Sequence, residues 1–243
     1  MVSIITPTYN AAEYVALMIE SVQSQSYSQY EHLIIDDCSS DNTLEIVQQY
    51  INKDNRIKLI RLKQNEGAGF ARNKGIEEAI NRYIAFLDSD DIWHPEKLEK
   101  QIKFMTSNNY AFTFTSYDQI DEDGKKKNKN VYTKERVTYK KALFDNPIGC
   151  LTVMYDSLLL GKQYMPTIRK RQDYALWLKI LKTTDGFGLN EILSSYRVRK
   201  NSISSNKLYL IKHQWRLYRT IEGFSVVKSM FYLFLIIINK IIK

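Results

Sequence analysis

The sequence predicts an α/β protein in which a mostly parallel sheet is flanked by helices. In the first half of the chain, short apolar runs alternate with amphipathic stretches, which is typical of strands joined by crossover helices. Turn-rich polar clusters follow several of these apolar runs. The composition is that of an ordinary globular protein, with 44% hydrophobic and 26% charged residues among 243. Low-complexity and collagen-like chains are therefore excluded.

Strands and helices are expected to alternate regularly through the first half. We expect strands over residues 2–6, 32–35, 57–62 and 83–87. We expect helices to follow Asn10 and to cover residues 44–50, 69–80 and 96–106. Two of these helix starts have the spacing of a capping box, Asn10 with Glu13 and Asn42 with Glu45. Pro95 suits the first turn of the last helix.

The second half is less regular but reads as further elements of the same sheet. We expect strands over residues 112–117, 150–155 and 192–198, and helices over residues 139–144 and 173–182. The charged run at 121–130 reads as a solvated loop or a hairpin end. Four apolar residues of the second helix recur at helical spacing and give it a face for the core: Tyr174, Trp177, Leu178 and Leu181.

Polar residues far apart in sequence are expected to gather at one edge of the sheet. Tyr9, Asp37 and Asp90 each come just after a predicted parallel strand. In open α/β sheets, ligands bind beyond the carboxyl ends of the strands. A single polar cluster is better explained as an ordinary turn. Three clusters at the same edge favour a ligand-binding site.

The strongest chemical signal is the acidic turn that contains Asp88, Asp90 and Asp91. Carboxylates this close repel one another, so a purely structural reason is hard to find. Hard divalent cations take oxygen ligands, and Mg²⁺ commonly combines one or two carboxylates with substrate phosphates. An isolated pair of acids with this spacing is a weak signal. Directly after an apolar strand, it predicts a Mn²⁺ or Mg²⁺ site that neutralises a departing diphosphate.

Several other classes of site are disfavoured by the sequence. The segment from Gly67 to Arg72 lacks the ending of a P-loop and has arginine where a dinucleotide fingerprint has its third glycine. Two cysteines and three scattered histidines cannot make a disulfide framework or a cysteine-rich zinc site. They indicate a reducing compartment, and the opening residues predict no signal peptide. The acids Asp36 and Asp37 end another apolar strand, where they suit either a base or ribose contact or helix capping, and Ser39 suits capping.

Five segments resemble, in order, the motifs of the family 2 glycosyltransferases. They are residues 2–10 (VSIITPTYN), 34–41 (IIDDCSSD), 65–75 (NEGAGFARNKG), 86–91 (FLDSDD) and 172–178 (QDYALWL). The resemblance covers roughly residues 1–205. It implies a GT-A fold and an inverting enzyme that uses a nucleotide sugar.

The resemblance also implies roles for residues at the nucleotide. Pro7 and Tyr9 would lie at the uridine, and Asp37 would bind the uracil. Arg72 would stand near the nucleotide and hold Asp37 or a phosphate. Asp88 and Asp90 would contact the ribose and the metal ion, with Asp91 as an alternative ligand.

The remaining implied roles concern the transfer itself. Asp173 matches the second acid of the family's Glu-Asp pair and would be the catalytic base, although Gln172 replaces the first acid. Without the family match, an N-cap for the following helix is as good an explanation of Asp173. A late loop holds Arg197, and Arg199 stands where the family usually has histidine. Arg199 at that position would face the diphosphate as a fixed cation.

The last part of the chain is expected to differ from the rest. Residues 207–243 hold seven Lys or Arg against one acid, most of the net charge of +8, whereas a nucleic-acid-binding protein would usually spread such charge over its folded face. The apolar run at 230–238 is too short to cross a bilayer, which needs about 20 residues. We expect a catalytic domain at 1–206 and a basic, apolar segment at 207–243 that lies on an anionic membrane surface. The alternative is a terminal helix packed on the domain.

The resemblance, together with the basic, apolar C-terminal segment, implies a hexosyltransferase of bacterial O-antigen or capsule assembly. It would move glucose or galactose from a UDP-sugar to a lipid-linked (polyprenyl diphosphate) saccharide, forming a β-linkage. It would act as a peripheral protein at the cytoplasmic face of the inner membrane, with no nucleic-acid partner. Alternatives are another donor such as UDP-GlcNAc or UDP-GalNAc, a non-lipid acceptor, a nucleotidyltransferase and a non-catalytic nucleotide-binding module.

Overall fold

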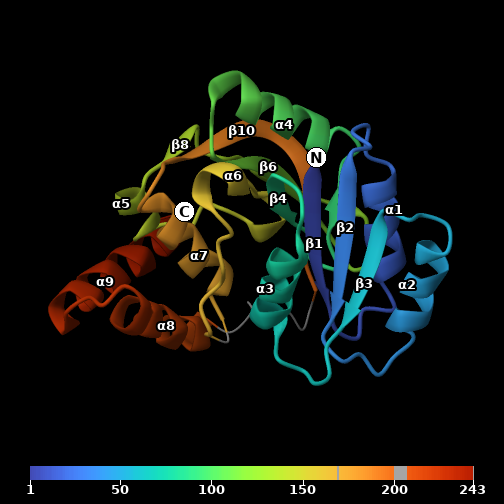
Figure 1. Cartoon of the computed structure of the whole chain (residues 1–243). Helices are drawn as coiled ribbons and strands as arrows, with labels where there is room; N and C mark the ends of the chain where they lie inside the picture. Colours follow the sequence, from blue (N-terminus) through green and yellow to red (C-terminus); the bar gives the residue numbers. More distant parts are fainter. Residues whose placement is uncertain (169, 200–206, 243) are drawn as a thin grey trace.

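The computed structural model describes residues 1–168, 170–199 and 207–242 (Figure 1). Its strands are β1 (Val2–Thr8), β2 (Tyr30–Asp36), β3 (Ile57–Arg61), β4 (Tyr83–Phe86), β5 (Ile92–Trp93), β6 (Phe112–Ile120), β7 (Lys126–Val131), β8 (Arg136–Val137), β9 (Met154–Asp156) and β10 (Gly186–Arg197). Its α-helices are α1 (Val15–Gln23), α2 (Thr43–Ile51), α3 (Ala68–Glu78), α4 (Lys97–Asn108), α5 (Tyr139–Ala142), α6 (Ser157–Leu160), α7 (Gln172–Leu181), α8 (Lys207–Arg216) and α9 (Val226–Ile242). A 3₁₀ turn covers Cys150–Thr152 and a π-helical turn covers Leu217–Ile221.

The strands described form one sheet in the order β3-β2-β1-β4-β9-β6-β10-β5, with β7 beside β6 and β8 beside β10. The N-terminal strands β3, β2, β1 and β4 pair in parallel, and the long strands β6 and β10 are also parallel. The short strands β5, β8 and β9 and the hairpin strand β7 run antiparallel to their neighbours. This arrangement confirms the α/β fold with a central sheet and flanking helices.

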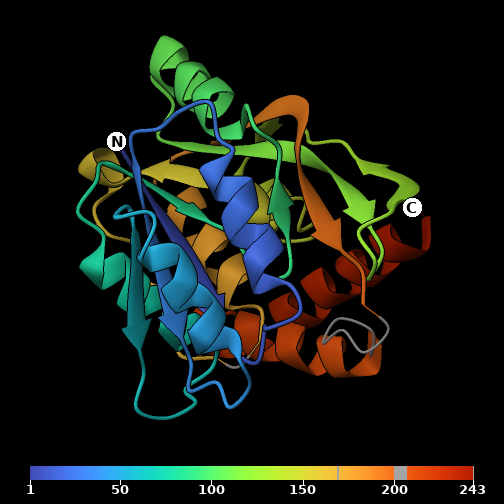
Figure 2. The same ribbon diagram turned by 90° about the vertical axis from the view of Figure 1, so that its right-hand side faces the viewer.

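Each face of the sheet packs against its own set of helices. Ile4 and Ile34 face α1, α2 and α4, whereas Ile5 and Ile35 face α3 and the core around α7. Figures 1 and 2 show α3 on one side of β1, β2 and β3 and α1 and α2 on the other. The N-terminal strands are buried on both faces, which explains why they appear in the sequence as continuous apolar runs.

A glycine sets the distance between α3 and the sheet. A Cβ on Gly75 would lie 2.5 Å from the Ile5 Cγ2 atom and 2.8 Å from the Ile35 Cδ1 atom. Any larger residue would therefore push α3 away from β1 and β2. The position of this helix matters because it carries Arg72 to the carboxyl edge of the sheet.

The C-terminal helices pack against the rest of the chain along one side. Leu217, Tyr218, Phe224 and Ile236 are buried in the same core as α7. The Tyr218 hydroxyl donates to the Leu143 carbonyl oxygen. Among the described residues, no helix is both long and apolar enough to cross a membrane.

Polar contacts reinforce the packing of the C-terminal helices. Glu222 is paired with Lys182 at 2.8 Å and accepts a hydrogen bond from the Tyr139 hydroxyl. Figure 1 places α8 and α9 beside each other, next to α7 and α5. The described part of residues 207–243 thus shares the core of the domain.

Candidate functional site

The loops that follow β1 and β2 are joined by hydrogen bonds at the carboxyl edge of the sheet. The Asn10 N–H donates to the Ser39 hydroxyl at 2.9 Å, and the Ser40 N–H donates to Asn10 Oδ1 at 2.8 Å. Asn10 and Cys38 have positive φ angles of 47° and 66°. Such backbone strain in non-glycine residues is common where loops are shaped around a ligand.

These bonds also show that the expected capping boxes do not form. Helix α1 begins at Val15, and the Asn10 side chain accepts from Ser40 instead of capping it. Helix α2 begins at Thr43, where Asp41 Oδ1 accepts from the Thr43 N–H at 3.0 Å and from its hydroxyl. The predicted capping boxes were wrong: the Asn10 side chain bonds to the loop after β2, and Asn42 occupies the N-cap position of α2 without a side-chain capping bond, because the adjacent Asp41 bonds the first residue of the helix.

Asp37 organises a third loop at the same edge. Its two carboxylate oxygens accept from the N–H groups of Glu66 and Gly67 at 2.7 and 2.8 Å. Asp37 is buried, whereas Tyr9 is 53% exposed at the neighbouring loop. Pro7 is buried within β1, opposite Ile35. The structure thus places Asp37 as the support of the loop that begins α3 and Tyr9 as the accessible ring.

Arg72 connects α3 to the acidic turn. Its guanidinium pairs with the Asp88 carboxylate, and its side chain is only 8% exposed. Burial alone would lower the pKa of Arg72, but the charge of Asp88, the hydrogen bond to it and the charges of neighbouring groups together outweigh burial and raise the pKa. Arg72 is therefore a permanent buried cation, and it pairs with Asp88 rather than with Asp37.

The other two acids of the turn differ in their surroundings. Asp90 is partly accessible and pairs with Arg199 at 3.0 Å. Asp91 is buried and accepts the Arg197 N–H at 2.8 Å. Burial, followed by the neighbouring Asp88 charge, raises the pKa of Asp90, and burial with both neighbouring acids raises the pKa of Asp91 still more.

Arg197 is buried and holds the ends of several segments together. Its Nε–H donates to the Asp90 carbonyl oxygen at 2.8 Å. Its Nη1 donates to the Asp121 and Glu122 carbonyl oxygens at 3.0 and 2.9 Å. These bonds fix the acidic turn to the β6–β7 hairpin, and Arg199 lies more exposed beside it.

Asp173 lies in the first turn of α7, close to the buried arginine. The residue at the N-cap is Arg171, which has a φ of 66°, and no side chain caps this helix. The alternative explanation of Asp173 as an N-cap is therefore wrong. Gln172 packs against Gly69, whose missing Cβ leaves the room it needs, so the starts of α3 and α7 touch. The charge of Asp173 helps to raise the pKa of Arg72.

Cys150 is a member of this cluster that sequence reasoning missed. It is buried, and burial raises the pKa of its thiol well above the ordinary value despite the charge of Arg72. The charges of Asp88 and Asp173 raise the pKa of this thiol further. A lone cysteine at the start of a predicted strand gave no signal in the sequence. The thiol therefore stays protonated as a small, uncharged group beside Arg72.

The acids that remain accessible suit a divalent cation shared with a substrate. Among the described residues, no three His, Cys, Asp or Glu side chains are grouped as a complete metal site. Asp88 and Asp90 are 31% and 21% exposed, and Asp91 is occupied by Arg197. Two carboxylates plus phosphate oxygens form a normal ligand set for Mg²⁺. The residues present therefore fit such an ion once a diphosphate is bound.

Comparisons with known proteins agree with this geometry. The sequence profile of the family described as "Glycosyl transferase family 2" matches residues 3–160. The chain is 47% identical over 230 residues to TuaG of Bacillus subtilis, which is named for teichuronic acid biosynthesis, covering 94% of this chain and 91% of TuaG. It is 43% identical over 221 residues to WfgD of Escherichia coli, covering 88% and 84% of the two chains. WfgD is named a UDP-Glc:alpha-D-GlcNAc-diphosphoundecaprenol beta-1,3-glucosyltransferase.

A solved structure extends the likeness to the whole fold. The S. aureus TarS 1–349 complex with UDP-GlcNAc superposes with a TM-score of 0.77 at 22% identity. The superposition covers 97% of this chain and 71% of the TarS chain. With the match of the family profile and the identity to TuaG and WfgD, the conclusion is direct. The chain is a glycosyltransferase that belongs to family 2 and has the GT-A fold.

Proposed function

We propose that this glycosyltransferase inverts configuration as it moves a hexose from a UDP-sugar to a hydroxyl of a lipid-linked saccharide. The observation that carries the proposal is the convergence at one sheet edge of the Asp37 loop, the acidic turn and the start of α7, with Arg72 between the last two. The name of WfgD supports a UDP-sugar donor and an undecaprenyl diphosphate acceptor.

The nucleotide would bind across the loops after β1 and β2. Tyr9 offers an exposed ring for the uracil, Pro7 shapes the strand end below it, and Asp37 lies in the adjoining loop. Asp37 already accepts two backbone N–H groups, and its second lone pairs can accept the uracil N–H. These residues would hold the base while the diphosphate lies over the acidic turn.

Asp88 and Asp90 would hold Mn²⁺ or Mg²⁺ together with the diphosphate. Such an ion, when bound, neutralises the charge that develops on the leaving diphosphate. Arg199 would then exchange its contact with Asp90 for a phosphate oxygen. Asp91, bound to Arg197, would keep the shape of the turn.

Asp173 would take the proton of the acceptor hydroxyl as it attacks the anomeric carbon. A general base must lie within hydrogen-bond reach of that hydroxyl, and Asp173 stands free of capping at the edge of the cluster. The nucleoside diphosphate would leave from the opposite face of the sugar. A single displacement inverts configuration, so an α-linked donor gives a β-linked product.

One face of α9 would dock on the membrane that holds the acceptor. Val227, Met230, Phe231 and Phe234 are 56–78% exposed and recur at helical spacing. On the other side of the helix, Tyr232, Leu233, Ile236 and Ile237 pack on the core. The exposed residues lie in the segment that carries most of the net charge, which favours an anionic lipid surface. This placement corresponds to a peripheral protein at the cytoplasmic face of the inner membrane.

Point variants test the membrane face better than a truncation, because part of the C-terminal segment belongs to the core. The double variant Phe231→Ser/Phe234→Ser should reduce the fraction of protein that sediments with anionic vesicles about tenfold or more. Each substitution removes an apolar contact with lipid. Leu17→Ser, on the exposed side of α1, is the matched control. Equal binding by all three proteins would refute the docking face.

A donor panel tests the transferase proposal directly. Purified protein would be mixed with UDP-Glc, UDP-Gal, UDP-GlcNAc and UDP-GalNAc in the presence of Mn²⁺ and a synthetic polyprenyl diphosphate saccharide. Acceptor-dependent release of UDP from UDP-Glc or UDP-Gal, with a β-linked product, is the expected result. It would support a role in O-antigen or capsule assembly. Turnover confined to an acetamido sugar, or no turnover, would refute the hexose assignment.

A further inference from the structure

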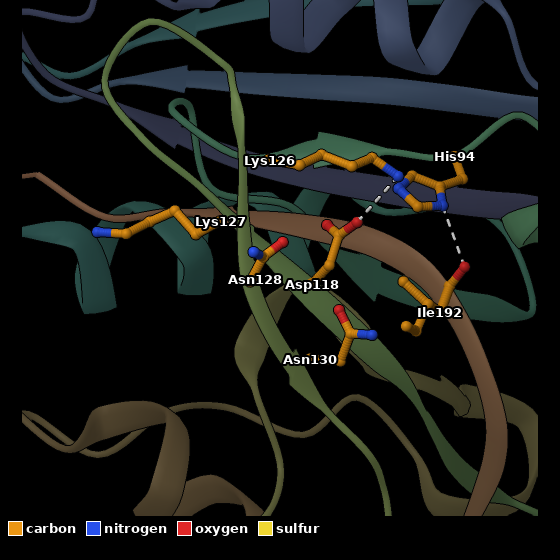
Figure 3. Close-up of a pocket in the computed structure, with 7 residues that line it drawn as sticks. All are labelled: His94, Asp118, Lys126, Lys127, Asn128, Asn130 and Ile192. Carbon is orange, nitrogen blue, oxygen red and sulfur yellow. Dashed lines mark hydrogen bonds and ion pairs between the residues drawn. The ribbon is translucent and has the colours of Figure 1, made fainter.

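A cavity away from the acidic turn has the features of a second binding site. It has a volume of about 600 Å³ and lies between strand β7 and the turn after β5 (Figure 3). Small-molecule sites typically have about 300–1,000 Å³. Neither Asp88, Asp90 nor Asp173 lines it. The side chains used below are those of His94, Asp118, Lys126, Asn128 and Asn130.

Asp118 gives the cavity an unpaired acceptor. Its side chain is 5% exposed, and Oδ2 lies 3.4 Å from the Lys126 Nζ atom. Oδ1 is buried and has no hydrogen-bond partner. A buried carboxylate oxygen without a donor is unfavourable, and such atoms in folded proteins call for an explanation. A ligand with a hydrogen-bond donor would supply one.

The remaining polar groups offer both kinds of hydrogen bond. Asn130 lies directly opposite Asp118 in the β6–β7 pairing, and its amide donates to the Tyr132 hydroxyl at 3.3 Å. Carboxamides such as those of Asn128 and Asn130 both donate and accept, whereas Lys126 only donates. Figure 3 shows these side chains gathered on one side of the strand.

His94 forms a fixed wall of the same cavity. Its Nδ1 atom lies 3.0 Å from the Ile192 carbonyl oxygen, and its Nε2 atom lies 3.0 Å from the Ser195 hydroxyl. Both ring nitrogens are therefore engaged, which holds the ring in one orientation. One wall of the cavity is thus a rigid imidazole.

This mixture of groups selects one class of ligand. Phosphate oxygens would be repelled by the free Asp118 oxygen, and an amine cation would be repelled by Lys126. An apolar molecule would leave Asp118 Oδ1 without a hydrogen-bond donor. A sugar hydroxyl can donate to Asp118 and accept from Lys126 at once. We propose that this cavity binds a neutral saccharide through Asp118, Lys126 and Asn130.

Strand β6 leads from the cavity toward the candidate active site. Asp118 lies three residues before Asp121, whose carbonyl oxygen accepts from Arg197. At about 3.3 Å per residue, that separation is roughly 10 Å. A saccharide in the cavity would be a part of the acceptor chain that does not react. This assignment of the saccharide rests on the proposed transferase function, but saccharide binding itself does not.

Saturation-transfer difference NMR on the full chain tests the proposal without a donor or turnover. Maltose, cellobiose and lactose would be the probes, in EDTA, with inorganic phosphate as an anionic competitor. Asn130→Ala removes one contact from an exposed strand and should weaken binding about three- to tenfold. Asp118→Asn replaces the carboxylate and should weaken it similarly, with its melting temperature measured alongside. Lys129→Ala is the control, because Lys129 is an exposed residue of the same strand β7 that does not line the cavity.

The outcomes separate this proposal from the transferase proposal. Binding of at least one disaccharide, weakened by Asn130→Ala and unchanged by Lys129→Ala, would support the saccharide site even if no UDP-sugar is turned over. Absence of any signal would overturn it, as would equal affinity of the Asn130→Ala protein and the wild type. Displacement of the saccharide by millimolar phosphate would also overturn it, since an anion site would then be present.

Discussion

Removal of either partner of the Arg72–Asp88 pair should destabilise the protein, but by unequal amounts. Arg72 is 8% exposed and its Nε atom has no partner, whereas Asp88 is 31% exposed. Asp88→Ala leaves a buried guanidinium without its counter-ion, which should lower the free energy of unfolding by about 3–5 kcal/mol. Arg72→Met leaves a carboxylate that can regain water, so a loss of about 1–2 kcal/mol is expected.

Urea unfolding in EDTA measures this difference without interference from a metal ion. The double variant should lose no more than Asp88→Ala alone, because no unpaired charge remains when both partners are gone. Asp90→Ala provides the control. Its partner Arg199 is 45% exposed, and exposed pairs contribute only about 0–1 kcal/mol.

Equal losses for the two single variants, or a larger loss for Arg72→Met, would refute this reasoning. Additive losses in the double variant would show that the two side chains act independently.

Three further predictions concern the catalytic base, the metal ion and a buried lysine. Asp173→Asn should lower kcat by about 10²–10⁴-fold while UDP-sugar binding, followed by calorimetry, stays within a factor of three; near-normal turnover would remove Asp173 from the mechanism. EDTA should abolish transfer and Mn²⁺ or Mg²⁺ should restore it, whereas full activity after metal stripping would show that Asp88 and Asp90 hold no essential ion. Burial lowers the pKa of Lys97 to about 7, so between about pH 7 and 10 the unfolded chain binds more protons at this residue and stability should rise with pH. Lys97→Met should lose that rise, and urea midpoints that change with pH as in the wild type would contradict it.

The strands could be predicted well because their physical signal is local. A strand buried on both faces needs consecutive apolar residues, as in β1, β2 and β4. The region 150–155 was harder, since it divides into a 3₁₀ turn and the short strand β9. Helix α1 begins later than expected because Asn10 bonds to Ser40, a residue that the sequence places far away.

The site was only partly predictable, because much of it depends on contacts between distant segments. The sequence indicated that acids lie at strand ends, and the structure places Asp37 and Asp88 there. It could not show that Arg197 binds three backbone carbonyl oxygens or that Arg171 has a left-handed backbone. Nor could it show that Cys150 is buried beside Arg72. Such roles depend on tertiary neighbours and have no fixed spacing.

The attachment of α9 to the core has a geometric consequence for a membrane-bound acceptor. Tyr232, Leu233, Ile236 and Ile237 of α9 pack on the core, and Tyr218 and Glu222 just before the helix bond to Leu143 and Lys182, so the helix is held against the domain. A helix lying flat in the lipid headgroups would therefore fix both the tilt of the whole protein and the height of Asp173 above the bilayer. The enzyme would therefore select acceptors whose reactive hydroxyl stands at one distance from the lipid, independently of the sugars that they contain.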